Sequence, residues 1–488
     1  MKIVFASFEC VPFVKVGGLA DVVGSLPKFL KQKKVDVRVI IPLHSKKIDK
    51  KKFKLKETNQ KVVIPLKEEY IEGKIWQGKL DKNIKVYLLE NDRFFGREEV
   101  YATSEGDYED NPLRFIFFSR GVLETLKAVD FKADIIHCHD MQTGLIPAYL
   151  KTLYSIDAFF QHTKSVFTIH NIAYQGLYDY KIFELAGFAP YDFTPEKFEY
   201  YGKINFMKSG IVFSDIVTTV SPTYAKMVCD SHIEGRGLEG VLSKKYSEGK
   251  VIGILNGIDY NEWNPETDEY IKANYNIKQI EKKSLCKEEL QKICEFKISQ
   301  EIPLYGMVSR IDPLKGFDLI IRVLPKLLSE NEVQVVILGK GKKELQEKLQ
   351  QISKEYKDSF RLFIDFNNPL GHKIYAAADF FLMPSSSEPC GLSQMIAMRY
   401  ATIPIVYKTG GLVDTVEQFD IETKKGCGFI FEQYNEEQFY NKILQSIEIF
   451  HNKEIFKILR INCMQKNFSW DVSAKKYIEI YDSILKGK

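Results

Sequence analysis

The stretch 304–338 reads LYGMVSRIDPLKGFDLIIRVLPKLLSENEVQVVIL and places a helical pattern between two short apolar runs. The runs Leu304–Ser309 and Gln334–Leu338 are predicted to be buried strands, and Leu319–Leu328 is predicted to be a helix. Continuous apolar strands separated by helices indicate a parallel sheet whose two faces are both covered. The stretch therefore predicts an α/β fold.

The same alternation extends along the rest of the chain. Downstream, we expect helices at Lys343–Ser353 and Ile374–Ala378 and strands at Phe360–Phe366 and Phe380–Met383. Upstream, Leu19–Lys31 is predicted to be a helix. The strands predicted upstream are Lys2–Phe8, Lys34–Ile41, Val86–Leu89, Asp134–Cys138, Ser165–Ile169 and Ile216–Val220, with Lys61–Pro65 and Ile75–Gly78 forming an inserted meander.

The alternation dissolves between Asn256 and Lys297, a charged stretch that contains Pro265. A chain of 488 residues is long enough for two large domains. We therefore predict a Rossmann-like domain over residues 1–255 and a second one over residues 256–468. Residues 469–488 are predicted to form a final amphipathic helix, whose start is marked by Ser469.

Composition excludes several classes of protein. Hydrophobic residues make up 45% of the chain and charged residues 27%, which is ordinary globular usage and not that of a disordered or collagen-like protein. The 69 basic and 65 acidic residues nearly cancel, so a nucleic-acid partner is not expected. The Lys-rich stretch 28–56 is interpreted as a solvated surface.

The cysteines and the hydropathy pattern bear on location. The eight Cys include no Cys-x-x-Cys pair, which fits a reducing compartment. No window approaches about 18 uninterrupted apolar residues, so no membrane partner is expected. The apolar N-terminal run is broken by Glu9 and lacks the core of a signal peptide. We predict a cytoplasmic protein; the plastid stroma stays open, although no transit peptide is recognised in this chain.

A short sequence repeat occurs once in each predicted domain. Residues 16–23, VGGLADVV, align with residues 409–416, TGGLVDTV, and each copy is predicted to open a helix. A glycine pair at the start of a helix lets backbone amides approach an anion. A single pair is often only a turn, but one pair in each domain suggests two anion-holding loops that face one interdomain cleft.

Charged residues follow several of the predicted strands. Arg310 and Lys315 lie in one turn after the strand that begins at Leu304, where both cations can address a pyrophosphate. Lys15, next to the first glycine pair, also suits a phosphate. Glu388 is predicted to be the N-cap or the preceding residue of a helix, with Pro389 in its first turn. The alternatives are exposed basic residues and a simple helix cap.

Histidines lie at two strand ends. His137 and His139 share one face of their strand, and with Asp140 they could ligate a metal ion, although no second histidine cluster supports this. His170 ends another strand and is either structural or functional. The sequence contains no Gly-x-Ser-x-Gly elbow, P-loop or Gly-x-Gly-x-x-Gly motif, which argues against a hydrolase triad, an ATPase and a Rossmann dehydrogenase.

Taken together, these motifs resemble the bacterial glycogen synthase and plant starch synthase family over nearly the whole chain. The matching segments are 15–22 (KVGGLADV), 139–140 (HD), 169–176 (IHNIAYQG), 220–225 (VSPTYA), 256–259 (NGID), 309–310 (SR), 315–316 (KG), 388–392 (EPCGL) and 409–415 (TGGLVDT). The resemblance implies a GT-B fold, with two Rossmann-like domains facing a deep cleft and a C-terminal helix that crosses back to the first domain.

The resemblance also implies an activity: retaining transfer of glucose from ADP-glucose to the non-reducing end of an α-1,4-glucan, with no metal and no cofactor. The first domain would lie on the acceptor side, and the second would bind the nucleotide sugar. The catalytic residues it implies are His170, Arg310, Lys315 and Glu388. The donor-binding residues it implies are Lys15, Gly17, Gly18, Asn256, Cys390, Gly391, Leu392, Thr409, Gly410 and Gly411, and those on the acceptor side are Asp21, Asp140 and Tyr101.

Three positions depart from the family pattern: Val16, Met141 and Ser387, where the family often has Thr, Trp and an aromatic residue. The sequence offers no obvious carboxylate for a double displacement, so we favour same-face attack with the leaving phosphate as base. Three alternatives remain open. They are a related transferase that uses UDP-glucose or a small acceptor, a silent glucan-binding or sugar-nucleotide-sensing protein, and a metallohydrolase built on His137, His139 and Asp140.

Overall fold

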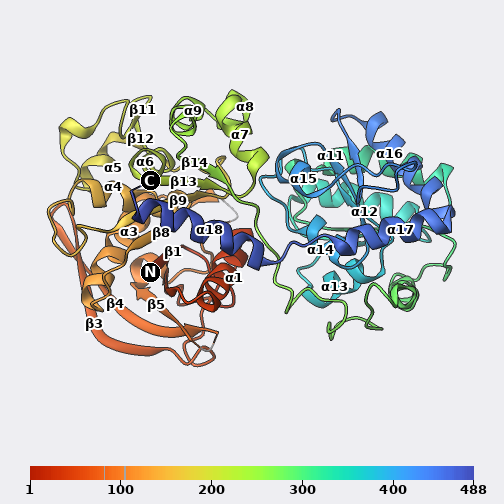
Figure 1. The fold of residues 1–488 in the computed structure, drawn as a ribbon, viewed down its shortest axis with the longest axis horizontal. Coiled ribbons are helices and arrows are strands. Elements are labelled where there is room, and N and C mark those ends of the chain that lie inside the picture. The colour runs from red at the N-terminus through yellow and green to blue at the C-terminus, as the bar shows by residue number, and fades with distance from the viewer. Residues whose placement is uncertain (82, 104–105, 488) are drawn as a thin grey trace. The chain divides into compact units, whose positions relative to one another are not determined.

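The computed structural model describes residues 1–81, 83–103 and 106–487 and divides into two compact units. Unit 1 comprises residues 1–255 together with the C-terminal segment from residue 470, and unit 2 comprises residues 256–469. Each unit contains a sheet with helices packed around it (Figure 1). Unit 1 is therefore discontinuous in sequence, because both ends of the chain contribute to it.

The main sheet of unit 1 has the strand order β14-β13-β9-β8-β1-β2-β5-β4-β3. Neighbours from β14 to β5 pair in parallel, and β5, β4 and β3 pair antiparallel, which confirms the predicted meander. The strands are β1 (Lys2–Ala6), β2 (Asp36–Pro42), β3 (Lys56–Leu66), β4 (Glu69–Leu80), β5 (Ile84–Glu90), β8 (Ile135–His139), β9 (Lys164–Ile169), β13 (Ile216–Thr219) and β14 (Val251–Gly253). Short strands form two small sheets: β6 (Ala102–Thr103) with β7 (Gly106–Asp107), and β10 (Leu177–Asp179) with β12 (Lys203–Asn205) and β11 (Glu199–Tyr200).

The last helix of the chain packs within unit 1. Figure 1 shows α18 in blue beside α1 in red, and the two helices are in contact. Lys33 forms a 2.6 Å ion pair with Asp471, and the Ser473 hydroxyl donates to the carbonyl of Leu255 at 2.6 Å. The helices are α1 (Gly18–Gln32), α2 (Asp92–Phe95), α3 (Asn111–Ala128), α4 (Leu145–Lys151), α5 (Tyr180–Leu185), α6 (Phe206–Phe213), α7 (Pro222–Asp230), α8 (His232–Gly235), α9 (Glu239–Ser247) and α18 (Trp470–Leu485), with 3-10 turns at Met141–Thr143 and Pro190–Asp192.

The sheet of unit 2 has the order β17-β16-β15-β18-β19-β20 and pairs in parallel throughout, as the alternating pattern predicts. Its strands are β15 (Leu304–Val308), β16 (Gln334–Leu338), β17 (Phe360–Phe363), β18 (Phe380–Met383), β19 (Ile403–Tyr407) and β20 (Phe429–Phe431). Its helices are α10 (Lys283–Ile293), α11 (Phe317–Glu330), α12 (Lys343–Glu355), α13 (Asn368–Ala377), α14 (Ser393–Arg399), α15 (Gly410–Thr415), α16 (Glu436–His451) and α17 (Lys453–Gln465), with 3-10 turns at Ile280–Lys282 and Pro313–Lys315.

Buried charges hold α10 in the core of unit 2. The Lys283 ammonium is fully enclosed and donates to the carbonyl of Ala376 at 2.8 Å, the carbonyl of Tyr400 at 3.0 Å and the hydroxyl of Thr402 at 2.7 Å. Those two carbonyls lie at the C-terminal ends of α13 and α14, where helices leave acceptors without an intrahelical partner. One lysine therefore satisfies both helix ends.

Lys287, one turn along α10, supports the same core by ion pairing. Its ammonium lies 2.7 Å from the carboxylate of Asp379, which also binds Arg460 and accepts the backbone N–H of Leu304 at 2.9 Å. Asp379 is 1% exposed, so its pKa stays below the usual value only because two cations and a backbone donor outweigh the cost of burial.

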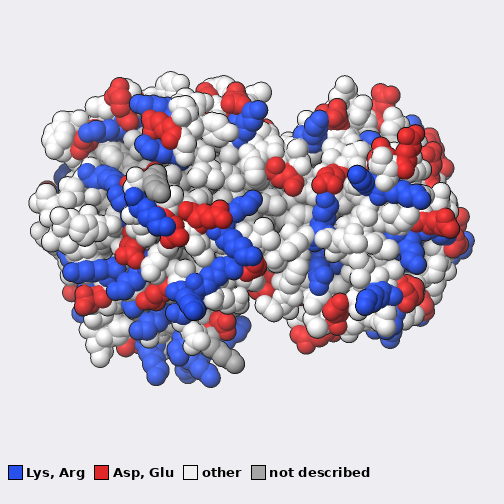
Figure 2. All heavy atoms as spheres, in the orientation of Figure 1, with Lys and Arg blue, Asp and Glu red and all other residues white. Residues whose placement is uncertain are grey.

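Charged side chains of both signs are interspersed on the visible face, with Lys and Arg concentrated over the lower part of unit 1 (Figure 2). Lysines of the Lys-rich stretch, among them Lys46, Lys47 and Lys51, are exposed, as predicted for a solvated surface. Lys47 pairs with Glu99 at 3.1 Å. Among the described residues, none of the helices is both long and apolar enough to cross a membrane.

A buried histidine gives unit 1 a pH-dependent stability. His44 is 1% exposed, its Nε2 donates to the carbonyl of Phe8 at 3.1 Å, and desolvation lowers its pKa from 6.5 to about 3. In the unfolded chain, His44 is therefore protonated as the pH falls below 6.5, whereas in the folded protein it stays neutral down to about pH 3. The contribution of His44 to stability is complete above pH 6.5 and is lost progressively as the pH falls towards 3.

The first prediction follows from this difference in pKa. Replacement His44→Gln keeps an amide donor near the Phe8 carbonyl and removes the titrating group. Between pH 7.5 and pH 5, the free energy of unfolding of the variant should fall by about 2 kcal/mol less than that of the wild type. Urea titrations followed by the fluorescence of Trp76, Trp263 and Trp470 measure this. Equal pH dependence in His44→Gln and in the exposed control His162→Gln would contradict the prediction.

Candidate active site

In unit 1, side chains gather where three neighbouring parallel strands end. β9, β8 and β1 lie next to one another in the sheet, and their carboxyl ends share one edge. The residues that follow these strands include His170 after β9, Asp140 after β8, and the segment from Ser7 to Gly17 after β1. Ligands of parallel sheets bind at this edge, so the topology defines a candidate site.

Glu9, which the sequence analysis noted only as a break in an apolar run, organises the first glycine loop. Its carboxylate accepts the backbone N–H groups of Val16 and Gly17, the latter at 2.9 Å, and the hydroxyl of Tyr101 at 2.6 Å. Burial raises its pKa in spite of these three donors. The only sequence signal was an acidic residue placed directly after a buried strand.

Lys15 and Asp21 pair with each other at the start of α1. The Lys15 ammonium lies 2.8 Å from the carboxylate of Asp21, and the lysine side chain is 56% exposed. Burial raises the pKa of Asp21, and the nearby lysine opposes that shift. The structure thus brings together two predicted residues, and leaves the lysine ammonium accessible to solvent.

Asp140 has a strained backbone. Its φ of 56° and ψ of −178° fall in a region that is almost restricted to glycine and costs about 1–3 kcal/mol. Its carboxylate accepts the N–H of His170 at 2.7 Å, and burial raises its pKa to about 7. Desolvation lowers the pKa of His170 to about 3, so the imidazole is neutral beside a carboxyl group that titrates near neutrality.

His137 of β8 has no ring nitrogen left to bind a metal ion. His137 is fully buried, with its Nδ1 2.7 Å from the Tyr481 hydroxyl and its Nε2 2.6 Å from the Thr168 hydroxyl. Both ring nitrogens of His137 are therefore engaged in hydrogen bonds with hydroxyl groups. Within the ranges that the structure describes, no group of three His, Cys, Asp or Glu could hold a metal ion. The alternative reading as a metallohydrolase has no support in the geometry.

Unit 2 has an equivalent sheet edge. β15, β18 and β19 are neighbours, and the loops that follow them carry Arg310, Lys315, Glu388 and the second glycine pair. The Lys315 ammonium lies 2.6 Å from the carboxylate of Glu388, across two loops that are 73 residues apart. Arg310 is exposed on the same loop as Lys315.

Two glycines allow these loops to pack closely. Gly316 has φ of 79°, and a Cβ there would lie 2.1 Å from the carbonyl of Pro384, after β18. Gly410 has φ of 43°, and its Cβ would lie 2.1 Å from the carbonyl of Glu388, which also accepts the N–H of Gly411 at 2.9 Å. The second glycine pair therefore rests on the backbone of the Glu388 loop.

The predicted helix start at Glu388 is wrong. Helix α14 begins at Ser393, and its N-cap is Leu392. Between them, Gly391 has φ of 74°, which interrupts any helical run from Pro389. Both glycine pairs do open helices as predicted, α1 at Gly18 and α15 at Gly410, with Thr409 as the N-cap of α15.

Cys390 and Asn256 lie together in unit 2. Cys390 is 5% exposed, and burial raises the pKa of its thiol to about 12, although the backbone N–H of Asn256 donates to it. The side-chain oxygen of Asn256 is buried without a hydrogen-bond partner among the described residues. Burial therefore disfavours the thiolate form of Cys390, and the side-chain oxygen of Asn256 is an unused acceptor among the described residues.

Gln394 is a residue that the sequence analysis missed. Its amide nitrogen donates to the carbonyls of Cys390 and Gly391 and to the hydroxyl of Thr415, each at 3.0 Å. The Thr415 hydroxyl in turn donates to the carbonyl of Gly411 at 2.8 Å. A single buried amide thus ties the Glu388 loop to α15, and no sequence motif distinguishes it from a surface glutamine of α14.

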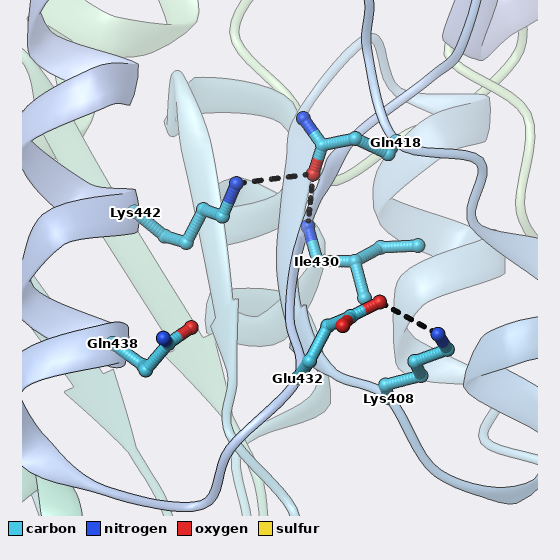
Figure 3. A pocket seen from close by; sticks show the side chains of 6 residues that line it. All are labelled: Lys408, Gln418, Ile430, Glu432, Gln438 and Lys442. Carbon is cyan, nitrogen blue, oxygen red and sulfur yellow. Dashed lines mark hydrogen bonds and ion pairs between the residues drawn. The ribbon is translucent and has the colours of Figure 1, made fainter.

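A separate hollow of about 350 Å³ lies on unit 2 and is shown in Figure 3. Its polar side chains are largely engaged: Lys408 pairs with Glu432 at 2.6 Å, and the side-chain oxygen of Gln418 accepts the backbone N–H of Ile430 at 2.8 Å. Lys442 and Gln438 complete the lining. None of the predicted site residues lines this hollow, so we do not place the active site there.

Comparisons with known proteins agree with this geometry. A model of the starch synthase catalytic domain matches residues 2–244, and a model of glycosyl transferases group 1 matches residues 291–454. Glycogen synthase of Thermosipho africanus is 43% identical, and that of Thermotoga maritima 40%, each over 99% of both chains. The catalytic domain of starch synthase IV from Arabidopsis thaliana, bound to ADP and acarbose, has 34% identity and a TM-score of 0.91, with 99% of each chain covered.

The fold, the two sheet edges and these matches define a two-domain α/β glycosyltransferase. Sucrose-phosphate synthase from Thermosynechococcus elongatus, with a TM-score of 0.62 at 14% identity over 100% of each chain, shares the fold alone. The chain belongs to the glycogen synthase and starch synthase family of retaining GT-B glycosyltransferases. The family predicted from the sequence motifs is therefore confirmed.

The two glycine pairs should respond differently to an added methyl group. Gly410→Ala places a Cβ against the Glu388 carbonyl at positive φ and should lower the free energy of unfolding by about 1–3 kcal/mol. Gly17→Ala is its matched control, because nothing lies within 4 Å of the added Cβ and its φ is −140°. Urea unfolding of both variants measures this, and equal losses of stability would contradict it.

Proposed function

We propose that this chain transfers glucose from ADP-glucose to the non-reducing end of an α-1,4-glucan, with retention of configuration at the anomeric carbon. The observation that carries the proposal is the Lys315–Glu388 pair on adjoining loops of unit 2. The family and the starch synthase relative bound to ADP and acarbose support the substrate classes.

In unit 2, we assign the donor nucleotide sugar to the edge formed by β15, β18 and β19. Arg310 and Lys315 neutralise the charge that develops on the departing diphosphate, one as a fork and the other as a point charge. Glu388 binds donor glucose hydroxyls. Lys315 and Glu388 form an ion pair in the structure, so each holds the other in position at 2.6 Å.

Backbone groups and small residues complete the donor site of unit 2. The amides of Gly410 and Gly411, after Thr409, hold phosphate or sugar oxygens at the start of α15. Cys390, Gly391 and Leu392 line the site through their backbone. Asn256 offers the buried side-chain oxygen that accepts no hydrogen bond from any described residue. A thiol of such high pKa contributes packing and not chemistry.

In unit 1, we assign His170 to the glucosyl unit and to the oxocarbenium-like transition state. Lys15 and Gly18 hold donor oxygens at the start of α1, and the Gly17 amide shares this loop while it donates to Glu9. Asp21, Asp140 and Tyr101 lie on the acceptor side. The strained backbone of Asp140 fits this assignment, because such strain persists where the surroundings fix a functional geometry.

For the chemical step, we propose attack on the same face as the departing phosphate. The bond from the anomeric carbon to the diphosphate oxygen breaks while the bond to the glucan hydroxyl oxygen forms. The leaving diphosphate accepts the hydroxyl proton, and no enzyme carboxylate is glucosylated. Trapping a covalent glucosyl-enzyme would overturn this mechanism and leave the overall reaction unchanged.

The direct test measures glucose transfer to glycogen from ADP-glucose and from UDP-glucose, each with and without a chelator. Growth of the glucan from ADP-glucose, unaffected by the chelator, is the expected result. Preference for UDP-glucose would move the donor assignment and keep the transferase. No transfer from either donor would overturn the proposal in favour of another acceptor or a silent binding protein, which nucleotide-binding calorimetry separates.

The Lys315–Glu388 pair gives a sharper prediction. Lys315→Met removes a cation from the developing diphosphate charge and leaves the carboxylate of Glu388, 8% exposed, without this partner. We expect kcat to fall about 100- to 1000-fold while KM for glycogen changes little. Lys354→Met, at an exposed position of α12, is the matched control and should retain wild-type kcat. Equal kcat for both variants would contradict the role of Lys315.

A further inference from the structure

The two histidines of β8 remain without a role in the proposed reaction. His137 and His139 are both fully buried, and their rings stack with centroids 4.3 Å apart. Phe5 of β1 contacts both rings, with its ring centroid 5.4 Å from that of His139 and 4.7 Å from that of His137. The pair therefore lies in the sheet core directly beneath the edge that carries His170.

His139 contacts His170 through one hydrogen bond. Its Nδ1 lies 2.9 Å from Nε2 of His170. Burial lowers the pKa of both rings, that of His170 to about 3, so both imidazoles are neutral near pH 7. Of the two nitrogens that face each other, one carries a hydrogen and the other accepts it.

The far side of His139 decides which nitrogen donates. Its Nε2 is buried and makes no hydrogen bond with any described residue. If the hydrogen of His139 were on Nε2, a buried N–H would be left without an acceptor, which is rare in folded proteins. With the hydrogen on Nδ1, the unused group is only a buried lone pair, and an unused acceptor is less rare in folded proteins than an unused N–H.

We propose that His139 is a positioning residue that donates from Nδ1 to Nε2 of His170 and thereby fixes the hydrogen of His170 on Nδ1. The tautomer of an imidazole is set by the hydrogen bond that its other nitrogen makes. His170 then presents an N–H donor to an oxygen of its ligand. The identity of this ligand as the donor glucose rests on the proposed function. The assignment of the tautomer is independent of that function.

His137 supplies a matched control for this role. It is as buried as His139 and stacks on it, but its two ring nitrogens form hydrogen bonds with the hydroxyls of Tyr481 and Thr168 and not with His170. A loss of packing should therefore appear in variants of both residues, and a change in the tautomer of His170 only in variants of His139.

The test is a two-bond ¹H–¹⁵N spectrum of the full chain labelled with ¹⁵N-histidine, which shows which ring nitrogen of each of the eight histidines carries the hydrogen. The signals of His170 are assigned by their loss in His170→Gln. In the wild type, Nδ1 of His170 should be protonated and Nε2 bare. A protonated Nε2 would overturn the proposal without any variant of His139.

Variants then separate the hydrogen bond from packing. His139→Phe keeps a ring in the stack and removes the donor, so His170 should become a mixture of tautomers. His139→Asn places an amide N–H where Nδ1 was and should restore the wild-type tautomer. His137→Phe should leave it unchanged. A pure Nδ1–H tautomer in His139→Phe would overturn the proposal.

Kinetics provide the link to the proposed function. We expect His139→Phe to lower kcat about tenfold, the effect of one lost hydrogen bond, with little change in KM, and His139→Asn to recover most of it. A changed tautomer with unchanged kcat would show that the positioning is real and that His170 does not act in transfer as proposed. The two failures are thus distinguishable.

Discussion

Parallel pairing of strands is the constraint on which both units depend. It forces β1, β8 and β9 to end at one edge in unit 1, and β15, β18 and β19 to end at one edge in unit 2. Each strand then delivers its following loop to the same place, whatever its distance along the chain. Lys315 and Glu388, 73 residues apart, form an ion pair for this reason. Residues that are scattered in sequence become one site without any local motif to join them.

The same fold also buries several charged and polar side chains. Glu9, Lys283 and Asp379 are nearly inaccessible to water, and each has at least three partners. An unsatisfied buried charge would cost several kcal/mol, so these partners are a condition of the fold. For the histidines of β8 the cost of burying a charge is avoided, because desolvation lowers the pKa of both rings and keeps them neutral. Buried carboxylates and lysines of both units are thus stabilised by several partners, whereas the buried histidines of unit 1 are kept neutral.

The sequence predicts part of unit 2 from simple alternation: the strands β15 to β18 and the helices α11, α12 and α13. The strands β19 and β20 and the helices α16 and α17 were not predicted. Helix α10 was not predicted, because its buried positions include Lys283, Lys287 and Gln291. These residues have helical spacing, but lysine and glutamine are typical of a protein surface. Glu388 was misassigned as a cap because the left-handed Gly391 is invisible in a hydropathy pattern. Glu9 acts through backbone donors that no side-chain motif reveals.

The return of α18 to unit 1 has a consequence for the order in which the protein is made. Trp470 and Tyr481, both at most 1% exposed, are part of the core of unit 1, and Tyr481 binds His137 in the central sheet. During synthesis, all of unit 2 is made before these residues, so the core of unit 1 stays incomplete until they follow. Unit 1 therefore reaches its final packing only after residues 470–485 have been synthesised, although its main sheet is synthesised first.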